Sequence, residues 1–203
     1  KNKNPSNSYG ITPYHMAAKY GHRDICELLI KYLDDKNPVS ILGRTPLDFA
    51  AMNGHLKVCE LIMENLVNTP HVNNGITHLH SAAFHGSVEL YKVVSNHLTN
   101  KNPSHANRTP FHVAASRGHL KLCKFIMDSL QNKNPGSIRQ FTPLHLAAKN
   151  GHRDVCVLIL ENVQNKMPET LHGITPEVLA IQNNHYELGK LLKKAGQAAS
   201  LYY

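Results

Sequence analysis

Apolar and polar positions along this chain follow a pattern that repeats about every 33 residues. Six threonines mark the register at steps of 33, 32, 32, 33 and 33 residues: Thr12, Thr45, Thr77, Thr109, Thr142 and Thr175. In five units an Ala-Ala pair follows at a fixed distance: Ala17-Ala18, Ala50-Ala51, Ala82-Ala83, Ala114-Ala115 and Ala147-Ala148. A glycine then closes each of these units: Gly21, Gly54, Gly86, Gly118 and Gly151. A repeat at fixed period indicates one supersecondary unit that is copied along the chain.

Each unit predicts two short helices. Thr caps the first helix, Pro follows it in five of the six units, small Ala side chains let a neighbouring helix approach, and Gly ends the helix with a positive φ. A second, amphipathic helix follows, as in RDICELLIKYL at residues 23–33. Its predicted apolar stripe occupies two offsets: Ile25, Val58, Leu90, Leu122, Val155 and Leu188, and then Leu28, Leu61, Val93, Phe125, Leu158 and Leu191. Because so small a pair cannot bury both of its faces alone, we expect the units to stack.

The stretches GITPYHMAAKYGH, NRTPFHVAASRGH and QFTPLHLAAKNGH resemble the ankyrin repeat, and the resemblance covers nearly the whole chain. It implies an all-α solenoid of stacked antiparallel helix pairs with hairpin-like loops between the repeats. It also implies a concave face built from loop tips and first helices, which binds proteins without catalysis. We expect one ankyrin repeat domain over residues 1–203, with repeats at about 10–40, 41–72, 73–104, 105–137, 138–170 and 171–203.

Three departures from the family pattern lead to further predictions. Apolar residues replace the usual glycine after the second helix, at Leu33, Leu98, Leu130 and Val163, and predict about one extra helical turn. The loop motif KNP stands seven residues before Thr12, as it does before Thr45, so we expect the chain to be a fragment of a longer protein with further repeats upstream. The sixth unit has the features of a cap: Glu177, Val178, Ile181 and Asn184.

The net positive charge of the chain is compatible with several kinds of partner and does not distinguish among them. Lys and Arg number 22 against 14 Asp and Glu, and a net charge of +8 suits nucleic acid, an anionic membrane surface or an acidic protein. The apolar runs are too short to span a membrane, and the first residues lack the charged-then-apolar layout of a signal peptide. We therefore expect an intracellular, cytoplasmic protein.

Histidine and cysteine recur at fixed offsets, which favours structural roles. Nine of the 15 histidines occupy two offsets: His15, His80, His112 and His145, and then His22, His55, His119, His152 and His185. The resemblance implies that the first set bridges the Thr hydroxyl and neighbouring backbone. All four cysteines share one offset, and equivalent positions in stacked helices are too far apart for disulfides, so we expect buried, reduced thiols at Cys26, Cys59, Cys123 and Cys156. We expect no metal, no cofactor and no enzymatic activity.

The candidate partner-binding residues come from the positions that the resemblance places on the concave face, four, three and one residue before each Thr and seven and eight after it. These thirty positions hold six Lys or Arg and no Asp or Glu. We expect a monomer that binds an acidic protein or peptide with apolar anchors. The residues predicted to bind are Tyr9, Lys19, Tyr20, Ile41, Leu42, Arg44, Met52, Phe84, His85, Arg108, Arg117, Ile138, Arg139, Phe141 and Lys149.

Three alternatives remain open at this point. Some of the apolar face residues could serve only to pack loop against loop. The basic charge could bind nucleic acid or another anionic ligand, although the chain has no Trp and no basic run. The repeats could also be an architectural spacer in a larger channel, enzyme or effector. The affinity of a protein for phosphate groups falls steeply as the salt concentration rises, whereas that of an apolar protein interface falls modestly. The salt dependence of binding therefore separates a nucleic-acid partner from a protein partner.

Overall fold

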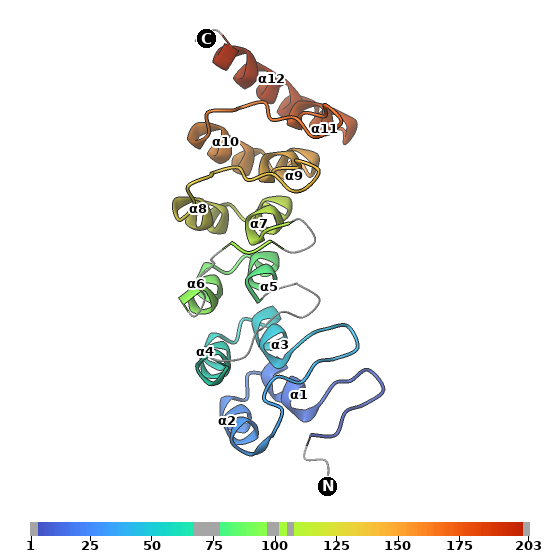
Figure 1. Ribbon diagram of the computed structural model, residues 1–203, viewed down its shortest axis with the longest axis vertical. Helices are drawn as coiled ribbons and strands as arrows, with labels where there is room; N and C mark the ends of the chain where they lie inside the picture. Colours follow the sequence, from blue (N-terminus) through green and yellow to red (C-terminus); the bar gives the residue numbers. More distant parts are fainter. Residues whose placement is uncertain (1–3, 67–77, 97–101, 105–107, 201–203) are drawn as a thin grey trace. The chain divides into compact units, whose positions relative to one another are not determined.

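The computed structural model of the chain describes residues 4–66, 78–96, 102–104 and 108–200 (Figure 1). These residues form twelve helices and no strand, which confirms the all-α prediction. The first six helices are α1 (Pro13–Lys19), α2 (Arg23–Tyr32), α3 (Pro46–Met52), α4 (Leu56–Asn65), α5 (His78–His85) and α6 (Val88–Asn96). The others are α7 (Pro110–Arg117), α8 (Leu120–Asp128), α9 (Pro143–Lys149), α10 (Arg153–Asn162), α11 (Pro176–Gln182) and α12 (Tyr186–Ser200).

The helices group into two compact units. Unit 1, residues 1–105, holds α1 to α6, and unit 2, residues 106–203, holds α7 to α12. In unit 1 the first helices α1, α3 and α5 pack side by side, and the second helices α2, α4 and α6 form a neighbouring layer (Figure 1). In unit 2, α7, α9 and α11 form the corresponding row, α8 packs against α10, and α12 packs against α11. Within each unit the predicted stacking of helix pairs is confirmed.

Thr begins the first helix of each pair wherever the structure describes that residue. Thr12, Thr45, Thr109, Thr142 and Thr175 are N-caps in extended backbone, and Pro follows each of them inside the helix. The N–H groups of the first helical turn have no carbonyl partner within the helix, and the hydroxyl oxygen of Thr accepts a hydrogen bond from one of them. Proline is tolerated directly after Thr because its missing N–H would have no partner there. Thr77 lies outside the described residues, and α5 begins at the residue that follows it.

Glycine permits the tight turn between the two helices of a pair. Gly118 caps α7 with a φ of 74° in the left-handed region, where a Cβ would be strained. The N–H of His119 then returns to the carbonyl of Ala114 at 3.1 Å, and α8 begins at the next residue. The alanines of all five Ala-Ala pairs are buried, so first helices lie close to their neighbours.

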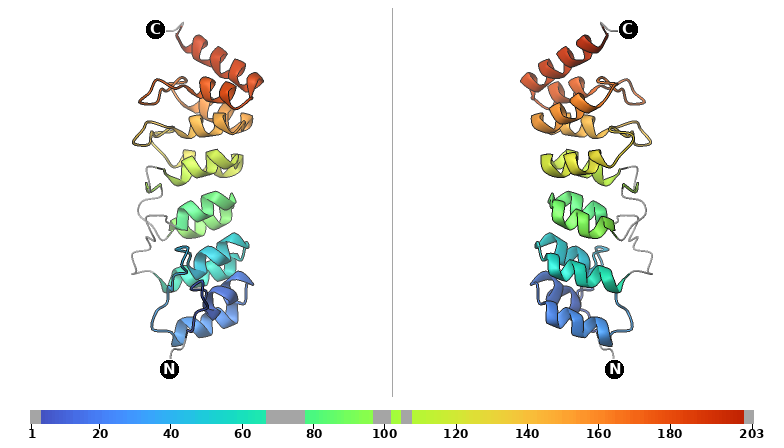
Figure 2. Two further views of the ribbon diagram at one scale, coloured as in Figure 1. Left: turned by 90° about the vertical axis from the view of Figure 1, so that its right-hand side faces the viewer. Right: turned by 90° about the vertical axis from the view of Figure 1, so that its left-hand side faces the viewer.

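Within each unit, the loops that the structure describes are hairpin-like, as predicted, and they project away from the second helices of that unit (Figure 2). In unit 1 the N–H of Ser40 donates to the carbonyl of Arg44 at 2.9 Å, and Asn7 and Ile11 make the same bond at 3.0 Å. In unit 2 the equivalent bonds join Ser137 to Phe141 at 2.8 Å and Thr170 to Ile174 at 3.0 Å.

The prediction of an extra turn on the second helices is wrong. α2 ends at Tyr32, and Leu33 leaves the helix in extended backbone with its side chain buried. α8 ends two residues before Leu130, and Val163 is the extended C-cap of α10; Leu98 lies outside the described residues. Leu33 is buried, whereas Leu130 and Val163 are half-buried, so an apolar side chain at this offset can be covered without being helical.

The predicted apolar stripe of the second helices is buried in part. Val58, Leu90, Leu122, Val155 and Leu188 are all buried, whereas Ile25 and Leu28 of α2 are 48% and 57% exposed. The prediction that these two residues are core is therefore wrong. Among the described residues α2 packs on α1 and α4, and these contacts leave Ile25 and Leu28 partly exposed.

No helix among the described residues is both long and apolar enough to cross a membrane.

Candidate functional site

The loop tips carry exposed apolar side chains on ordered backbone. Ile41, Leu42 and Ile138 are 72%, 80% and 72% exposed. The Ile41 N–H donates to the Tyr9 carbonyl at 3.0 Å, which joins the first two loops of unit 1. The Leu171 N–H donates to the Arg139 carbonyl at 3.2 Å and joins two loops of unit 2 in the same way. Adjacent tips are thus linked through their backbones, while these side chains face solvent.

A buried histidine holds the end of the loop between the first two repeats. The N–H and hydroxyl of Thr12 lie 3.1 and 2.9 Å from His15 Nδ1, and His15 Nε2 lies 3.0 Å from the Arg44 carbonyl oxygen. Because a backbone N–H only donates and a carbonyl only accepts, the proton of His15 is on Nε2. His15 therefore connects its own helix cap to the loop of the next repeat.

The same arrangement recurs in unit 2. His112 Nε2 donates to the Phe141 carbonyl at 2.9 Å, and His145 Nε2 donates to the Ile174 carbonyl at 3.0 Å. Burial lowers the pKa of His15 and of His145, which favours the neutral ring that this network requires. The bridging role implied for this set of histidines is confirmed at His15, His112 and His145, and it extends to the neighbouring repeat.

The second histidine set links repeats in the opposite direction. His55 Nε2 donates to the Lys19 carbonyl of the preceding repeat at 3.0 Å, and His152 Nε2 donates to the Ser116 carbonyl at 3.0 Å. Each ring also packs against the preceding glycine, so a Cβ on Gly21 would lie 2.6 Å from His55 Nδ1. Both sets therefore fix backbone at the candidate binding positions.

In unit 1 the predicted binding residues lie on the loop tips and near the ends of the first helices. We call them the unit 1 loop face: Tyr9, Lys19, Tyr20, Ile41, Leu42, Arg44, Met52, Phe84 and His85. The Arg44 guanidinium donates to the Met52 sulfur at 3.4 Å, and Lys19 Nζ lies 5.2 Å from the Tyr20 ring centroid. Tyr9 and Tyr20 are exposed, and Phe84 is 45% exposed.

In unit 2 the corresponding set is the unit 2 loop face: Arg108, Arg117, Ile138, Arg139, Phe141 and Lys149. Arg117 and Lys149 end α7 and α9, which pack side by side. Beside them the Asn150 side chain donates to the Ser116 carbonyl at 3.1 Å. The Phe141 ring is half-buried, 5.7 Å from the His145 ring centroid, so it packs partly inward.

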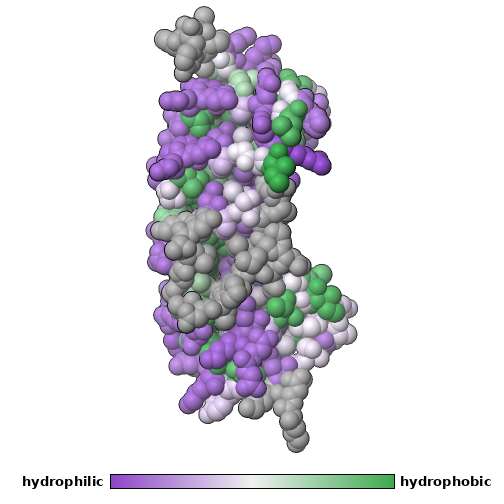
Figure 3. Space-filling model, viewed as in Figure 1, coloured by the Kyte–Doolittle hydropathy of each residue, from purple (hydrophilic) through white to green (hydrophobic). Residues whose placement is uncertain are grey.

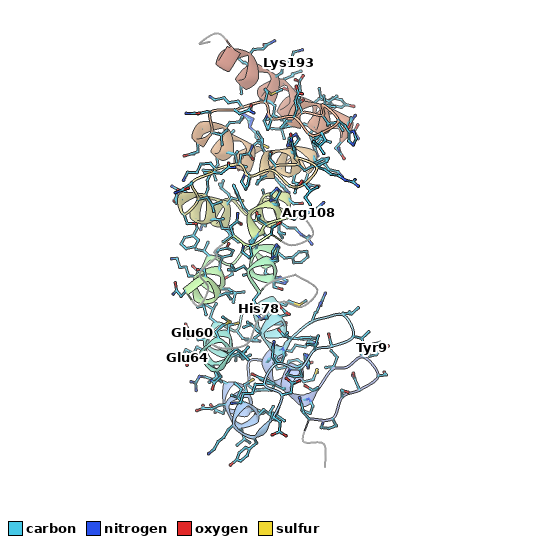
Figure 4. All side chains as sticks on the ribbon, viewed as in Figure 1. Tyr9, Glu60, Glu64, His78, Arg108 and Lys193 are labelled. Atoms are coloured by element: carbon cyan, nitrogen blue, oxygen red, sulfur yellow. The ribbon has the colours of Figure 1, made fainter. Side chains whose placement is uncertain are left out.

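Two carboxylates of unit 1, Glu60 and Glu64, lie away from its loop face. Figure 3 shows hydrophobic surface on the projecting loops of both units, and Figure 4 shows Tyr9 at a loop tip while Glu60 and Glu64 lie on α4, on the opposite side of unit 1. The residues of both loop faces are thus basic, apolar or histidine, and none of them is Asp or Glu.

Comparison with known protein families matches the chain to ankyrin repeats in three copies, at residues 1–70, 62–137 and 128–201. The chain belongs to the ankyrin repeat family. Ankyrin repeats generally mediate protein–protein interactions, and domains built from them are typically non-catalytic. Comparison with curated proteins gives no match.

One ankyrin position carries a polar cluster that the sequence analysis missed. Asp48 replaces the repeated histidine, accepts the Thr45 N–H at 2.9 Å and the Ser81 hydroxyl at 2.7 Å, and lies 3.4 Å from His78 Nδ1. Burial raises the pKa of Asp48, but the hydrogen bond and charge of His78, with the bonds from Thr45 and Ser81, lower it to about 2. The cluster is buried and joins α3 to α5, so it belongs to the scaffold. The sequence could have indicated this cluster, because two residues depart from the repeat pattern: residue 48 is Asp instead of His, and residue 78 is His instead of Pro.

The four cysteines of the ankyrin core are buried free thiols, as predicted. Burial raises the pKa of Cys26 to about 11 and that of Cys59, Cys123 and Cys156 to about 12. A protonated, inaccessible thiol is neither a nucleophile nor a ready metal ligand. In the part of the chain that the structure describes, no three His, Cys, Asp or Glu side chains are grouped to hold a metal ion.

Leu171 also belongs with the unit 2 loop face; it is one of the thirty candidate face positions, although it was not among the residues predicted to bind. It is 60% exposed, and its N–H bonds to the carbonyl of Arg139. The signal was available, because Leu171 occupies the same offset in its ankyrin repeat as Ile138 in the preceding one.

Proposed function

We propose that the loop faces bind an extended protein segment of acidic character, with aliphatic or aromatic anchors. The observation that carries this proposal is the exposure of Ile41, Leu42 and Ile138, at 72%, 80% and 72%, on loops held by hydrogen bonds. Single exposed apolar residues are ordinary, but adjacent ones on an ordered projecting loop are typical of an interaction surface.

Charge supports an acidic partner. Arg44 follows Ile41 and Leu42 on one loop, and Arg139 follows Ile138 on another. Residues 106–203 contain 12 Lys and Arg and 6 Asp and Glu, against 10 and 8 in residues 1–105, so unit 2 carries most of the net positive charge. Such a surface attracts an anionic segment before contact and disfavours a basic one.

Hydrogen bonds from the histidines hold the backbone of the loop faces in place before a partner binds. The carbonyl of Arg44 is held by His15, and that of Phe141 by His112. Because these positions are already ordered, binding loses less conformational entropy than it would on free loops.

A peptide display selection tests the proposal. The 203-residue chain is the bait, a displayed library of random peptides is the probe, and the affinity of a selected, labelled peptide is measured by fluorescence anisotropy. We expect Asp- or Glu-rich peptides with aliphatic or aromatic anchors. Ile41→Ser with Leu42→Ser, or Arg44→Glu, should weaken the selected peptide by about tenfold or more if that loop contributes an anchor. Arg139→Glu tests unit 2 in the same way.

Lys57→Glu is the matched control, because it makes the same charge change on the exposed surface of α4, away from the loops. Loss of binding in that variant alone would contradict the proposal. A single-stranded oligonucleotide in the same assay tests nucleic-acid binding. Tight oligonucleotide binding that falls steeply with salt, without peptide selection, would favour that alternative. If neither a peptide nor the oligonucleotide binds, the result supports the interpretation of the repeats as an architectural spacer.

A further inference from the structure

The two kinds of basic residue are distributed unequally over the chain. Of the six arginines, four belong to the loop faces: Arg44, Arg108, Arg117 and Arg139. Of the sixteen lysines, two do: Lys19 and Lys149. A solvated positive surface has no particular need of arginine, whereas the planar guanidinium forms paired hydrogen bonds with the oxygens of a carboxylate or a phosphate. The distribution therefore indicates that the loop faces bind an anion through directed hydrogen bonds as well as through charge.

In unit 2, three of these cations belong to two first helices that pack side by side. Arg108 lies beside α7, one residue before its Thr cap (Figure 4). Arg117 is the last residue of α7, and Lys149 is the last residue of α9, which packs on α7. All three side chains are exposed. Since α7 and α9 contain no Asp or Glu, no carboxylate of these two helices neutralises the cations.

Neutral hydrogen-bond donors adjoin these cations. The Asn150 amide donates to the carbonyl and to the hydroxyl oxygen of Ser116, both at 3.1 Å, and so lies across the ends of α7 and α9. Because Ser116 accepts in that bond, its own hydroxyl proton can be donated to a ligand. We call Arg108, Ser116, Arg117, Lys149 and Asn150 the α7–α9 cluster.

The repeat in unit 1 shows that the first two members of the cluster are within reach of each other. Arg44 and Met52 occupy the same offsets in their repeat as Arg108 and Ser116 do in theirs. The Arg44 guanidinium donates to the Met52 sulfur at 3.4 Å. An arginine at this offset can therefore extend along its own first helix to the residue that stands seven after the Thr.

The composition of the α7–α9 cluster fits a phosphate better than a carboxylate. A carboxylate carries one negative charge and two oxygens, whereas a phosphorylated side chain carries about −1.5 to −2 charges at pH 7 and three strong acceptor oxygens. Three cations with two neutral donors match the larger charge and the larger number of acceptors. Nucleic acid fits less well, because the exposed Ile138 and Leu171 of the same loop face are aliphatic, whereas bases stack on aromatic side chains.

We propose that the α7–α9 cluster binds the phosphate of a phosphorylated serine or threonine in a protein segment. This inference rests on the proposed function and names the partner of that surface more closely. Because Asn150 lies against the backbone of α7, the cluster is close to the surface of the helices, and a short phosphorylated side chain suffices to reach it. The aliphatic residues of the unit 2 loop face then contact apolar side chains of the same segment.

An arrayed peptide library tests the proposal. Random peptides are synthesised in three forms, with serine, glutamate or phosphoserine at the central position, and the 203-residue chain is the labelled probe. The affinity of the best binders is then measured by fluorescence anisotropy in all three forms. We expect the phosphoserine form to bind about tenfold more tightly than the other two. Arg108→Gln with Arg117→Gln should remove this preference and should affect the serine form far less, which also shows that the variant is folded.

Arg153→Gln is the matched control, because Arg153 is exposed at the start of α10, a second helix of the same unit. It should leave the preference for phosphoserine intact. Equal affinities of the phosphoserine and glutamate forms would overturn this inference and leave the proposed function in place. A preference that persists in the double variant, or that Arg153→Gln also removes, would overturn it as well. If no form of any peptide binds, this inference and the proposed function both fail.

Discussion

At the scale of single residues, a histidine tautomer decides how the repeats are joined. His15 and His145 each accept a Thr N–H on Nδ1 and donate from Nε2 to a carbonyl of the next repeat. A second proton on Nδ1 would face the Thr N–H and remove that bond. Burial lowers the pKa of both rings, in agreement with this geometry.

This network predicts that the fold loses stability in mild acid. A lowered folded-state pKa means that the unfolded chain binds more protons below its own His pKa of about 6.5. The stabilisation is therefore complete above that pH and is lost as the pH falls toward the folded-state value. For each such histidine the free energy of unfolding should fall by up to about 1.4 kcal/mol per pH unit in that window. Urea unfolding between pH 7.5 and 5.0 measures it.

His145→Gln should reduce this pH dependence, because the amide does not titrate. His22→Gln is the control, since His22 is exposed and should not change the slope. If the free energy of unfolding depends on pH in the same way in the His145→Gln variant and the parent chain, this histidine does not cause the loss of stability in acid.

At the scale of elements, the turn inside each pair is coupled to the next repeat. Gly118 and Gly54 both have a φ of 74°. A Cβ on Gly118 would lie 2.5 Å from His152 Nδ1, whereas a Cβ on Gly54 would meet nothing within 4 Å. The difference follows from the sequence, because Ser87 stands where the next repeat would place its histidine.

Replacement of these two glycines by alanine should therefore have unequal effects. Gly54→Ala should lower the free energy of unfolding by about 1–2 kcal/mol through backbone strain alone. Gly118→Ala should lose about 1 kcal/mol more, because His152 must shift and weaken its bond to Ser116. Urea denaturation of both variants gives the comparison. Equal losses would mean that the histidine does not constrain the glycine.

Element boundaries also show where periodicity fails as a guide. The Thr-Pro caps and the glycine turns lie where the pattern places them. The second helices, by contrast, end before Leu33 and Val163, although both side chains are apolar. Hydrophobicity predicts that a residue is buried, but an extended residue can fill the same space as a helical one.

At the scale of the molecule, units 1 and 2 are each held by their own helix contacts. Neighbouring pairs supply most contacts in a repeat protein, so stability is close to a sum over neighbours. That residues 1–203 form one domain remains a prediction. The +8 net charge is also a molecular property, and it affects partner choice more than folding.

This additivity predicts that residues 106–203 fold without residues 1–105. We expect a helical circular dichroism spectrum and a cooperative urea transition at a lower midpoint than that of the whole chain. Residues 120–203 are a useful comparison, since they lack α7 and leave α8 without its paired helix. A fragment 106–203 without helical signal would show that unit 2 needs the rest of the chain.

The sequence alone determined the repeat register, the all-α class and the caps, because each depends on local backbone chemistry copied at a fixed period. It also indicated the buried cysteines, because all four share one offset on the second helix. Tertiary structure decided which apolar residues are covered. Ile25 and Val58 occupy the same offset, yet one is 48% and the other 2% exposed, since burial depends on the neighbouring pair. The Asp48 cluster and the histidine links between repeats likewise required coordinates, because their partners lie about thirty residues away in the sequence.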